Sequence, residues 1–109
     1  MSRKIYNKLV RDKIPEIIRS KKKAFKVSIL TKEKYRKALK EKIDEEAKEL
    51  LEAKTNKDVL NELADIQELI NAVAKNHKIT VKTLENKRKE KTKERGGFEK
   101  KIFLEYVDE

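Results

Sequence analysis

The sequence predicts a mainly α-helical protein, an antiparallel helical bundle with two short β-strands. Two stretches, 31–54 and 56–75, carry apolar residues at helical spacing, and the only break between them is at Thr55 and Asn56. Because this break is short, the two long helices are expected to lie side by side and antiparallel. The apolar stripes consist of Tyr35, Leu39, Ile43, Ala47, Leu50 and Leu51 in the first helix and of Val59, Leu63, Ile66, Leu69, Ile70 and Val73 in the second.

Capping residues indicate where the helices begin. Asp12 is expected to cap a short helix with Pro15 in its first turn, and the basic run 19–23 ends that helix. Thr31 is expected to cap the first long helix. The second long helix is expected to begin at Asn56 or Lys57, directly after the break.

One more helix and two strands complete the expected elements. Thr80–Glu94 is predicted to be a very basic helix, which the glycine pair 96–97 stops. Phe25–Leu30 alternates apolar and polar residues, which is typical of a short strand. Phe98–Val107 alternates less regularly but also favours a strand, so the two segments are expected to pair as a small sheet.

Length and composition fit a single domain that comprises residues 1–109. Charged residues make up 46% of the chain, which leaves too few apolar residues for a large self-sufficient core, so an oligomer is expected. The absence of cysteine excludes disulfides and thiolate metal sites. No apolar run approaches membrane-spanning length and no signal peptide is evident, so we expect a cytoplasmic protein that does not enter membranes.

The formal net charge of +10 has two interpretations. One is an anionic partner such as a nucleotide, a nucleic acid or a membrane surface. The other is the Lys- and Glu-rich surface of a thermophile protein, which accounts better for the bulk of the charge. A few basic residues can serve a site in either case.

Two acidic clusters lie on the long helices, Glu45, Glu46 and Glu49 on the first and Glu62 and Asp65 on the second. At about 100° per residue, Glu62 and Glu46 each lie within about 40° of apolar residues in the stripe of their own helix. All but Glu45 are therefore expected to face the space between the helices, and Glu45 to point further toward solvent. The two clusters should lie at similar height because they are about equally far from the break.

Four carboxylates beside an apolar interface cannot all be ionised without compensating charge. A hard divalent cation with oxygen ligands would supply that charge, and Mg²⁺ fits best, with Mn²⁺ also possible. With two ions, one could activate a water while the other holds phosphate. The alternative is a set of ordinary salt bridges with Lys42, Lys48 or cations of a partner chain, which would be favoured for either cluster alone.

Three segments of the sequence resemble the all-α NTP pyrophosphatases. The signature of this superfamily is EExxE, then twelve residues, then ExxD, and the sequence has it at 45–49 and 62–65. The superfamily includes MazG-type enzymes, dimeric dUTPases and phosphoribosyl-ATP pyrophosphatases. YNKLVRDKIP at 6–15 and RGGF at 95–98 resemble the opening and the ending of a small MazG-like, phosphoribosyl-ATP-pyrophosphatase-like subfamily. Together the segments span nearly the whole chain, which makes the resemblance specific.

The resemblance implies a MazG-like helical bundle that assembles as a homodimer or homotetramer. It also implies Mg²⁺-dependent cleavage of a nucleoside triphosphate between the α- and β-phosphates, which gives a nucleoside monophosphate and pyrophosphate and removes non-standard nucleotides. Glu45 matches the first Glu of the motif and would orient water or a second ion. The implied metal ligands are Glu46, Glu49, Glu62 and Asp65, and the implied phosphate-binding residues of the following helix are Asn86, Lys87 and Arg88.

Other basic residues, and other functions, stay open. Lys8 and Arg11 either bind substrate phosphate or are ordinary surface charges. Arg95 either binds phosphate or only marks the end of its helix beside the two glycines. Phosphoribosyl-ATP is an alternative substrate, because the same motif serves the pyrophosphatase of histidine biosynthesis. The basic run Lys87–Lys93 permits a nucleic-acid-binding helical protein, although no nucleic-acid motif is present and metal-free carboxylates would repel phosphate. A silent, metal-stabilised assembly module is the third possibility.

Overall fold

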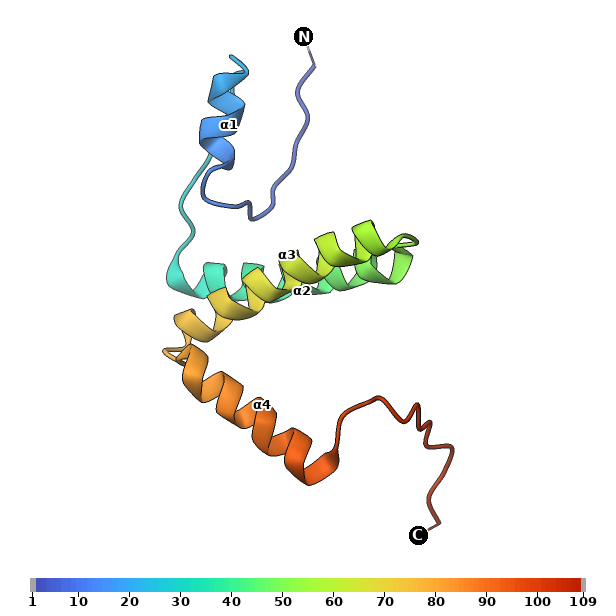
Figure 1. The fold of residues 1–109 in the computed structure, drawn as a ribbon. Coiled ribbons are helices and arrows are strands. Elements are labelled where there is room, and N and C mark those ends of the chain that lie inside the picture. Colours follow the sequence, from blue (N-terminus) through green and yellow to red (C-terminus); the bar gives the residue numbers. More distant parts are fainter. Residues whose placement is uncertain (1, 109) are drawn as a thin grey trace.

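A computed structural model of the chain describes residues 2–108 and contains four helices. They are α1 (Ile14–Ser20), α2 (Lys32–Glu52), α3 (Asn56–Asn76) and α4 (Val81–Arg95). The two long helices α2 and α3 lie side by side and antiparallel, as predicted (Figure 1). The N-terminal segment descends toward this hairpin before it turns back into α1, and α4 runs away from the hairpin's open end (Figure 1).

Threonine caps fix the starts of the three longer helices. The side chains of Thr31, Thr55 and Thr80 each accept a hydrogen bond from the backbone N–H three residues later, at 3.3, 3.1 and 3.0 Å. Each such cap contributes about 1 kcal/mol to helix stability. The predicted caps at Thr31 and Thr80 are confirmed, and Thr55, in the predicted break, caps α3.

The register of the hairpin is held at its open end by Arg36 on α2 and Asn76 on α3. The Arg36 Nε donates to the Asn76 side-chain oxygen at 2.6 Å, and its Nη2 donates to the Asn76 backbone carbonyl at 3.4 Å. At the other end, only Ala53, Lys54 and Thr55 connect the helices. Both ends therefore keep the middle of α2 opposite the middle of α3.

The predicted cap of the first helix is wrong by one residue. Helix α1 begins at Ile14 with Lys13 in the N-cap position and without a side-chain cap. The reason is Pro15. An N-cap side chain binds the N–H two or three residues later, and with Asp12 as N-cap the third position would be Pro15, which has no N–H.

The two predicted strands are also wrong, because residues 2–108 contain no β-strand. Phe25–Leu30 is an irregular connection between α1 and α2, and Phe98–Val107 follows α4 at the far end of the chain. A strand forms only where its backbone N–H and C=O groups pair with a neighbouring strand. Alternation in the sequence predicts such a segment only if a partner lies alongside, and here the two segments lie apart (Figure 1).

The buried interior is small and lies between α2 and α3. Leu39 and Ala74 are 2% and 8% exposed, and the third buried residue of the described chain is a carboxylate, Glu46. Leu51, predicted to lie in the apolar stripe, is 87% exposed, because it lies about 100° round the helix from the half-buried Leu50. In the part of the chain that is described, no helix is both long and apolar enough to cross a membrane.

Candidate metal centre

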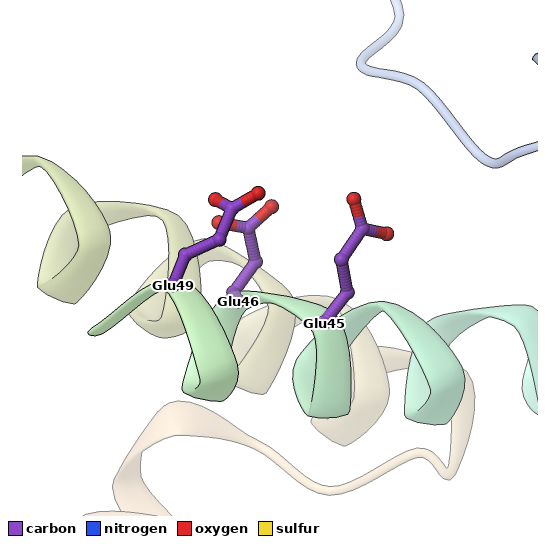
Figure 2. A group of neighbouring side chains, drawn as sticks. All are labelled: Glu45, Glu46 and Glu49. Atoms are coloured by element: carbon purple, nitrogen blue, oxygen red, sulfur yellow. The ribbon is translucent and has the colours of Figure 1, made fainter. Parts of the chain in front are cut away.

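Three carboxylates of α2 point to the same side of the helix. Glu45, Glu46 and Glu49 rise from consecutive turns toward the side on which the N-terminal segment lies (Figure 2). One carboxylate oxygen of each lies within 4.8 Å of one oxygen of the other two. Their burial differs, since Glu46 is buried, Glu45 is half-buried and Glu49 is exposed.

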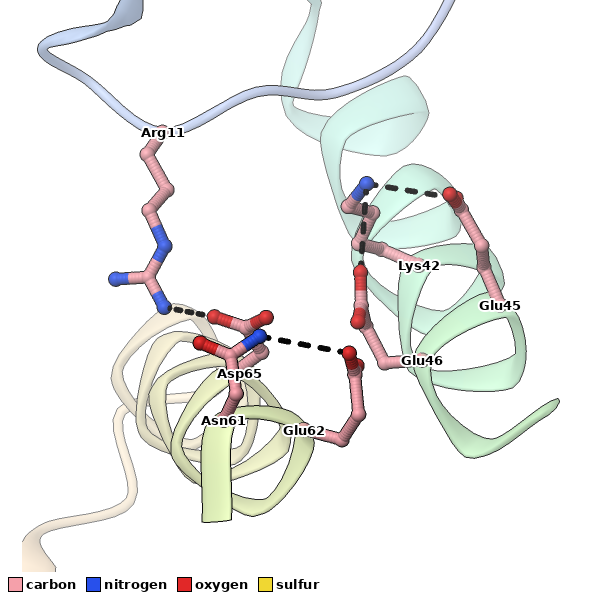
Figure 3. Close-up of polar contacts among 7 residues, drawn as sticks. All are labelled: Arg11, Lys42, Glu45, Glu46, Asn61, Glu62 and Asp65. Atoms are coloured by element: carbon pink, nitrogen blue, oxygen red, sulfur yellow. Dashed lines mark hydrogen bonds and ion pairs between the residues drawn. The ribbon is translucent and has the colours of Figure 1, made fainter. Parts of the chain in front are cut away.

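A second group of carboxylates bridges the two helices. Glu62 and Asp65 on α3 face Glu46 on α2, and one oxygen of each again lies within 4.8 Å of the others (Figure 3). Glu46 belongs to both groups and joins them. The predicted convergence across the hairpin is present for Glu46, Glu62 and Asp65. The wheel is wrong about the other two glutamates, because Glu49 is exposed and outside the bridging group, whereas Glu45, expected nearer the solvent, is half-buried.

Glu46 and Glu62 each hold one buried oxygen without a partner. Glu46 is 7% exposed. Among residues 2–108, neither Glu46 Oε2 nor Glu62 Oε2 has a hydrogen-bond partner. The other oxygen of each carboxylate is engaged, Glu46 Oε1 by Lys42 Nζ at 3.7 Å and Glu62 Oε1 by Asn61 Nδ2 at 3.5 Å. An unsatisfied buried oxygen costs about 1–3 kcal/mol, so the site calls for a proton or a cation.

Burial and its acidic neighbours raise the pKa of Glu46. Desolvation makes the largest contribution, followed by the hydrogen bonds that Glu46 can donate to Glu62 and Glu49 only when it is protonated, and then by repulsion from their charges. The pKa rises from 4.5 to about 7. A carboxyl group that keeps its proton near neutral pH shows how unfavourable a further negative charge is at this point. A divalent cation can take the place of that proton.

Two cations already contact the carboxylates. Lys42, on the same helix and 19% exposed, lies 3.4 Å from Glu45 and 3.7 Å from Glu46. Arg11, from the segment before α1, donates from Nη2 to Asp65 Oδ1 at 2.6 Å (Figure 3). From the sequence, Lys42 was only a salt-bridge alternative to the metal site, although its spacing of three and four residues to the two glutamates could have placed it beside them.

The predicted phosphate-binding residues are distributed unevenly. Arg11 lies at the carboxylates, whereas the exposed Lys8 lies with its Nζ 5.6 Å from the centre of the Tyr6 ring. Helix α4 contacts α3 but runs away from the carboxylates, so the single chain does not bring its basic residues to the site (Figure 1). Phosphate binding therefore stays a prediction for the α4 residues Asn86, Lys87, Arg88 and Arg95.

The residues present fit a hard divalent cation. The donors are carboxylate oxygens, which Mg²⁺ and Mn²⁺ prefer, and two of these oxygens are buried without a partner in the described chain. Water and phosphate oxygens would complete the shell of such an ion.

The described residues form an all-α fold with acidic residues on a helical hairpin, in agreement with the motifs. The chain belongs to the phosphoribosyl-ATP pyrophosphohydrolase family, whose pattern it matches over residues 11–92. The match extends from the segment before α1 into α4 and confirms the resemblance and the predicted enzyme class, a nucleotide pyrophosphohydrolase. No curated protein and no solved structure matches the chain.

Proposed function

We propose that the protein is a Mg²⁺-dependent nucleoside triphosphate pyrophosphohydrolase that cleaves between the α- and β-phosphates. The observation that carries the proposal is the pair of buried, unpartnered oxygens on Glu46 and Glu62, beside Asp65. Within the described residues these oxygens face each other across α2 and α3, where a cation would satisfy both (Figure 3). Removal of non-standard nucleotides is the cellular use that we infer.

The chain's own residues have distinct roles in this reaction. Glu46, Glu62 and Asp65 would hold the ion, with Glu49 beside Glu46, and the bound ion would supply positive charge to the phosphate oxygens and lower the pKa of water. A carboxylate outside the metal shell accepts the proton of the attacking water. The water oxygen then bonds to the α-phosphorus, and the bond to the bridging oxygen breaks, so that pyrophosphate leaves.

A nucleotide panel tests the proposal. Pyrophosphate release is measured with Mg²⁺ or Mn²⁺ on standard and non-standard nucleoside triphosphates and on phosphoribosyl-ATP. We expect release from at least one nucleoside triphosphate, its loss after chelation, and its return on addition of Mg²⁺. Orthophosphate in place of pyrophosphate, or no product from any nucleotide with either ion, would overturn the proposal.

Phosphoribosyl-ATP is a second candidate substrate, favoured by the family match over residues 11–92. The chemistry at the carboxylates is the same, since the bond cleaved in both substrates joins the α- and β-phosphates. The same panel separates the two. Turnover of phosphoribosyl-ATP far above that of every nucleoside triphosphate would assign the protein to histidine biosynthesis.

Replacing Arg11 is expected to strengthen metal binding and to weaken substrate binding. We infer that it neutralises Asp65 until an ion binds and then contacts substrate phosphate. In Arg11→Gln, Mn²⁺ should bind up to about fivefold more tightly, because an exposed ion pair is worth at most about 1 kcal/mol. The KM for nucleotide should rise about tenfold or more, since hydrogen bonds to charged groups contribute about 1.5–3 kcal/mol.

The matched control is Arg3→Gln, which removes an exposed arginine from the same segment. It should change neither the Kd of Mn²⁺ nor the KM. Weaker Mn²⁺ binding in Arg11→Gln would show that Arg11 supports the metal site and does not compete with the ion.

We also propose that the chain functions as a homo-oligomer. Its accessible surface is 11043 Å². A compact folded monomer of this mass exposes only about 6,300 Å². The excess is therefore larger than the roughly 1,000–2,500 Å² that each partner of an obligate interface buries. The exposed apolar side chains after α4 are Phe98, Ile102, Phe103, Leu104, Tyr106 and Val107.

Light scattering coupled to size-exclusion chromatography checks this assembly. At micromolar concentration the mass should be that of a dimer or tetramer of the 12.9 kDa chain. A chain shortened after Gly97 tests the contribution of the apolar segment and should shift the mass distribution toward the monomer. A full-length protein that elutes as a folded monomer would contradict the inference.

A further inference from the structure

The two candidate metal groups share Glu46 but are paired with different cations. In the group on α2 alone, Lys42 contacts two of the three carboxylates, Glu45 at 3.4 Å and Glu46 at 3.7 Å. In the group that bridges α2 and α3, Arg11 contacts Asp65 at 2.6 Å. Each group thus already has one positive charge beside it (Figure 3).

The two cations differ in how firmly they are held. Lys42 lies on the same helix as its partners, three and four residues before them, and its side chain is only 19% exposed. Arg11 is 58% exposed and reaches Asp65 from a non-helical segment 54 positions earlier in the chain. An exposed ion pair contributes little to stability, so Arg11 can leave Asp65 at small cost, whereas Lys42 is kept at its glutamates by the helix itself.

The free oxygens also distinguish the two groups. Among residues 2–108, the buried side-chain oxygens without a partner are Oε2 of Glu46 and Oε2 of Glu62. Glu62 belongs only to the bridging group, and the remaining oxygen of Glu46 is the one that faces Lys42. The bridging group therefore has buried oxygens without a partner, while in the α2 group Lys42 already pairs with two of the three carboxylates.

We propose that Lys42 takes the place of a second metal ion, so that the nucleotide-free protein binds a single divalent ion, in the group of Glu46, Glu62 and Asp65. The proposal rests on the metal-dependent function proposed above and specifies how many ions the site holds. Lys42 acts as a positioning residue, since it fixes Glu45 and one oxygen of Glu46. Glu45 is then bound to Lys42 and does not ligate the ion.

Mn²⁺ titration followed by electron paramagnetic resonance, without nucleotide, tests the proposal. Three proteins are compared: wild type, Lys42→Met and the control Lys48→Met. Methionine keeps most of the length of the lysine side chain and removes its charge. Lys48 forms an ion pair of the same kind, 3.1 Å from Asp44 and four residues away, but both partners are exposed and outside the two groups. Far-UV circular dichroism verifies that each variant is folded.

We expect one bound Mn²⁺ per chain in wild type and Lys48→Met, and two in Lys42→Met. Adding Glu45→Gln to Lys42→Met should return the number to one, because the second ion would lose a ligand. Two ions in wild type, or one ion in a folded Lys42→Met, would overturn the role of Lys42 and leave the metal-dependent function standing. No bound ion in wild type would overturn the proposed metal site itself.

Discussion

Replacing Glu62 by glutamine is expected to slow pyrophosphate release at least about a hundredfold, since loss of even an outer partner of a metal site costs about 10–100-fold. Glutamine keeps the shape of the side chain but removes its charge and places either an amide nitrogen or a weaker ligand at the buried Oε2 position. The measurement is the initial rate with saturating Mg²⁺ on the best substrate of the nucleotide panel.

The matched control is Glu68→Gln, which changes an exposed glutamate on the same helix, α3. Its rate should stay close to that of wild type. Without metal, Glu62→Gln should unfold at the same temperature as wild type or higher, because one acidic neighbour of Glu46 is neutralised. Equal rates for Glu62→Gln and wild type would remove Glu62 from the reaction.

The metal-free protein should lose stability as the pH rises from about 4.5 to about 7, because the pKa of Glu46 is raised over that range by burial. Below 4.5 the carboxyl is protonated in both states and carries no penalty. Between the two values the unfolded chain has released the proton while the folded chain holds it, so stability falls. Above pH 7 the full loss is reached, roughly 3 kcal/mol at about 1.4 kcal/mol per unit.

Denaturant unfolding in chelator at several pH values measures this effect. Since other groups titrate in the same range, the decisive quantity is the difference between wild type and Glu46→Gln, whose stability should lack this component. Addition of Mg²⁺ or Mn²⁺ above pH 7 should restore stability to wild type more than to the variant. Parallel pH profiles of the two proteins would show that Glu46 titrates normally.

Much of the fold was predictable because it rests on local rules. Helical spacing of apolar residues located α2 and α3, and Thr31 and Thr80 marked helix starts by a hydrogen bond within three residues. The two strands were not predictable in this way, since a strand depends on a partner that a single segment does not encode. Leu51 was wrongly placed in the stripe, because at about 100° per residue it lies well round the helix from Leu50, which is half-buried.

The carboxylate site was predictable for the same reason as the hairpin. Glu46 and Glu62 lie within apolar stripes, so the contact that packs the helices also brings their side chains together. The Arg11 contact with Asp65 was not predictable in geometry, because it depends on the path of an irregular segment. The pairing of Lys42 with Glu45 could have been predicted from its spacing of three residues, but the buried oxygens without a partner on Glu46 and Glu62 needed the structure.

The short connection at 53–55 has a consequence for the order of events during folding. Glu46 and Asp65 are about 20 residues apart, so the carboxylates meet as soon as one helical hairpin closes, a low-contact-order step that is fast in small proteins. In the proposed metal site, every ligand lies on α2 or α3. We expect a newly made chain to bind its ion first and assemble afterwards, with the ion holding the hairpin closed until its remaining apolar surface is covered.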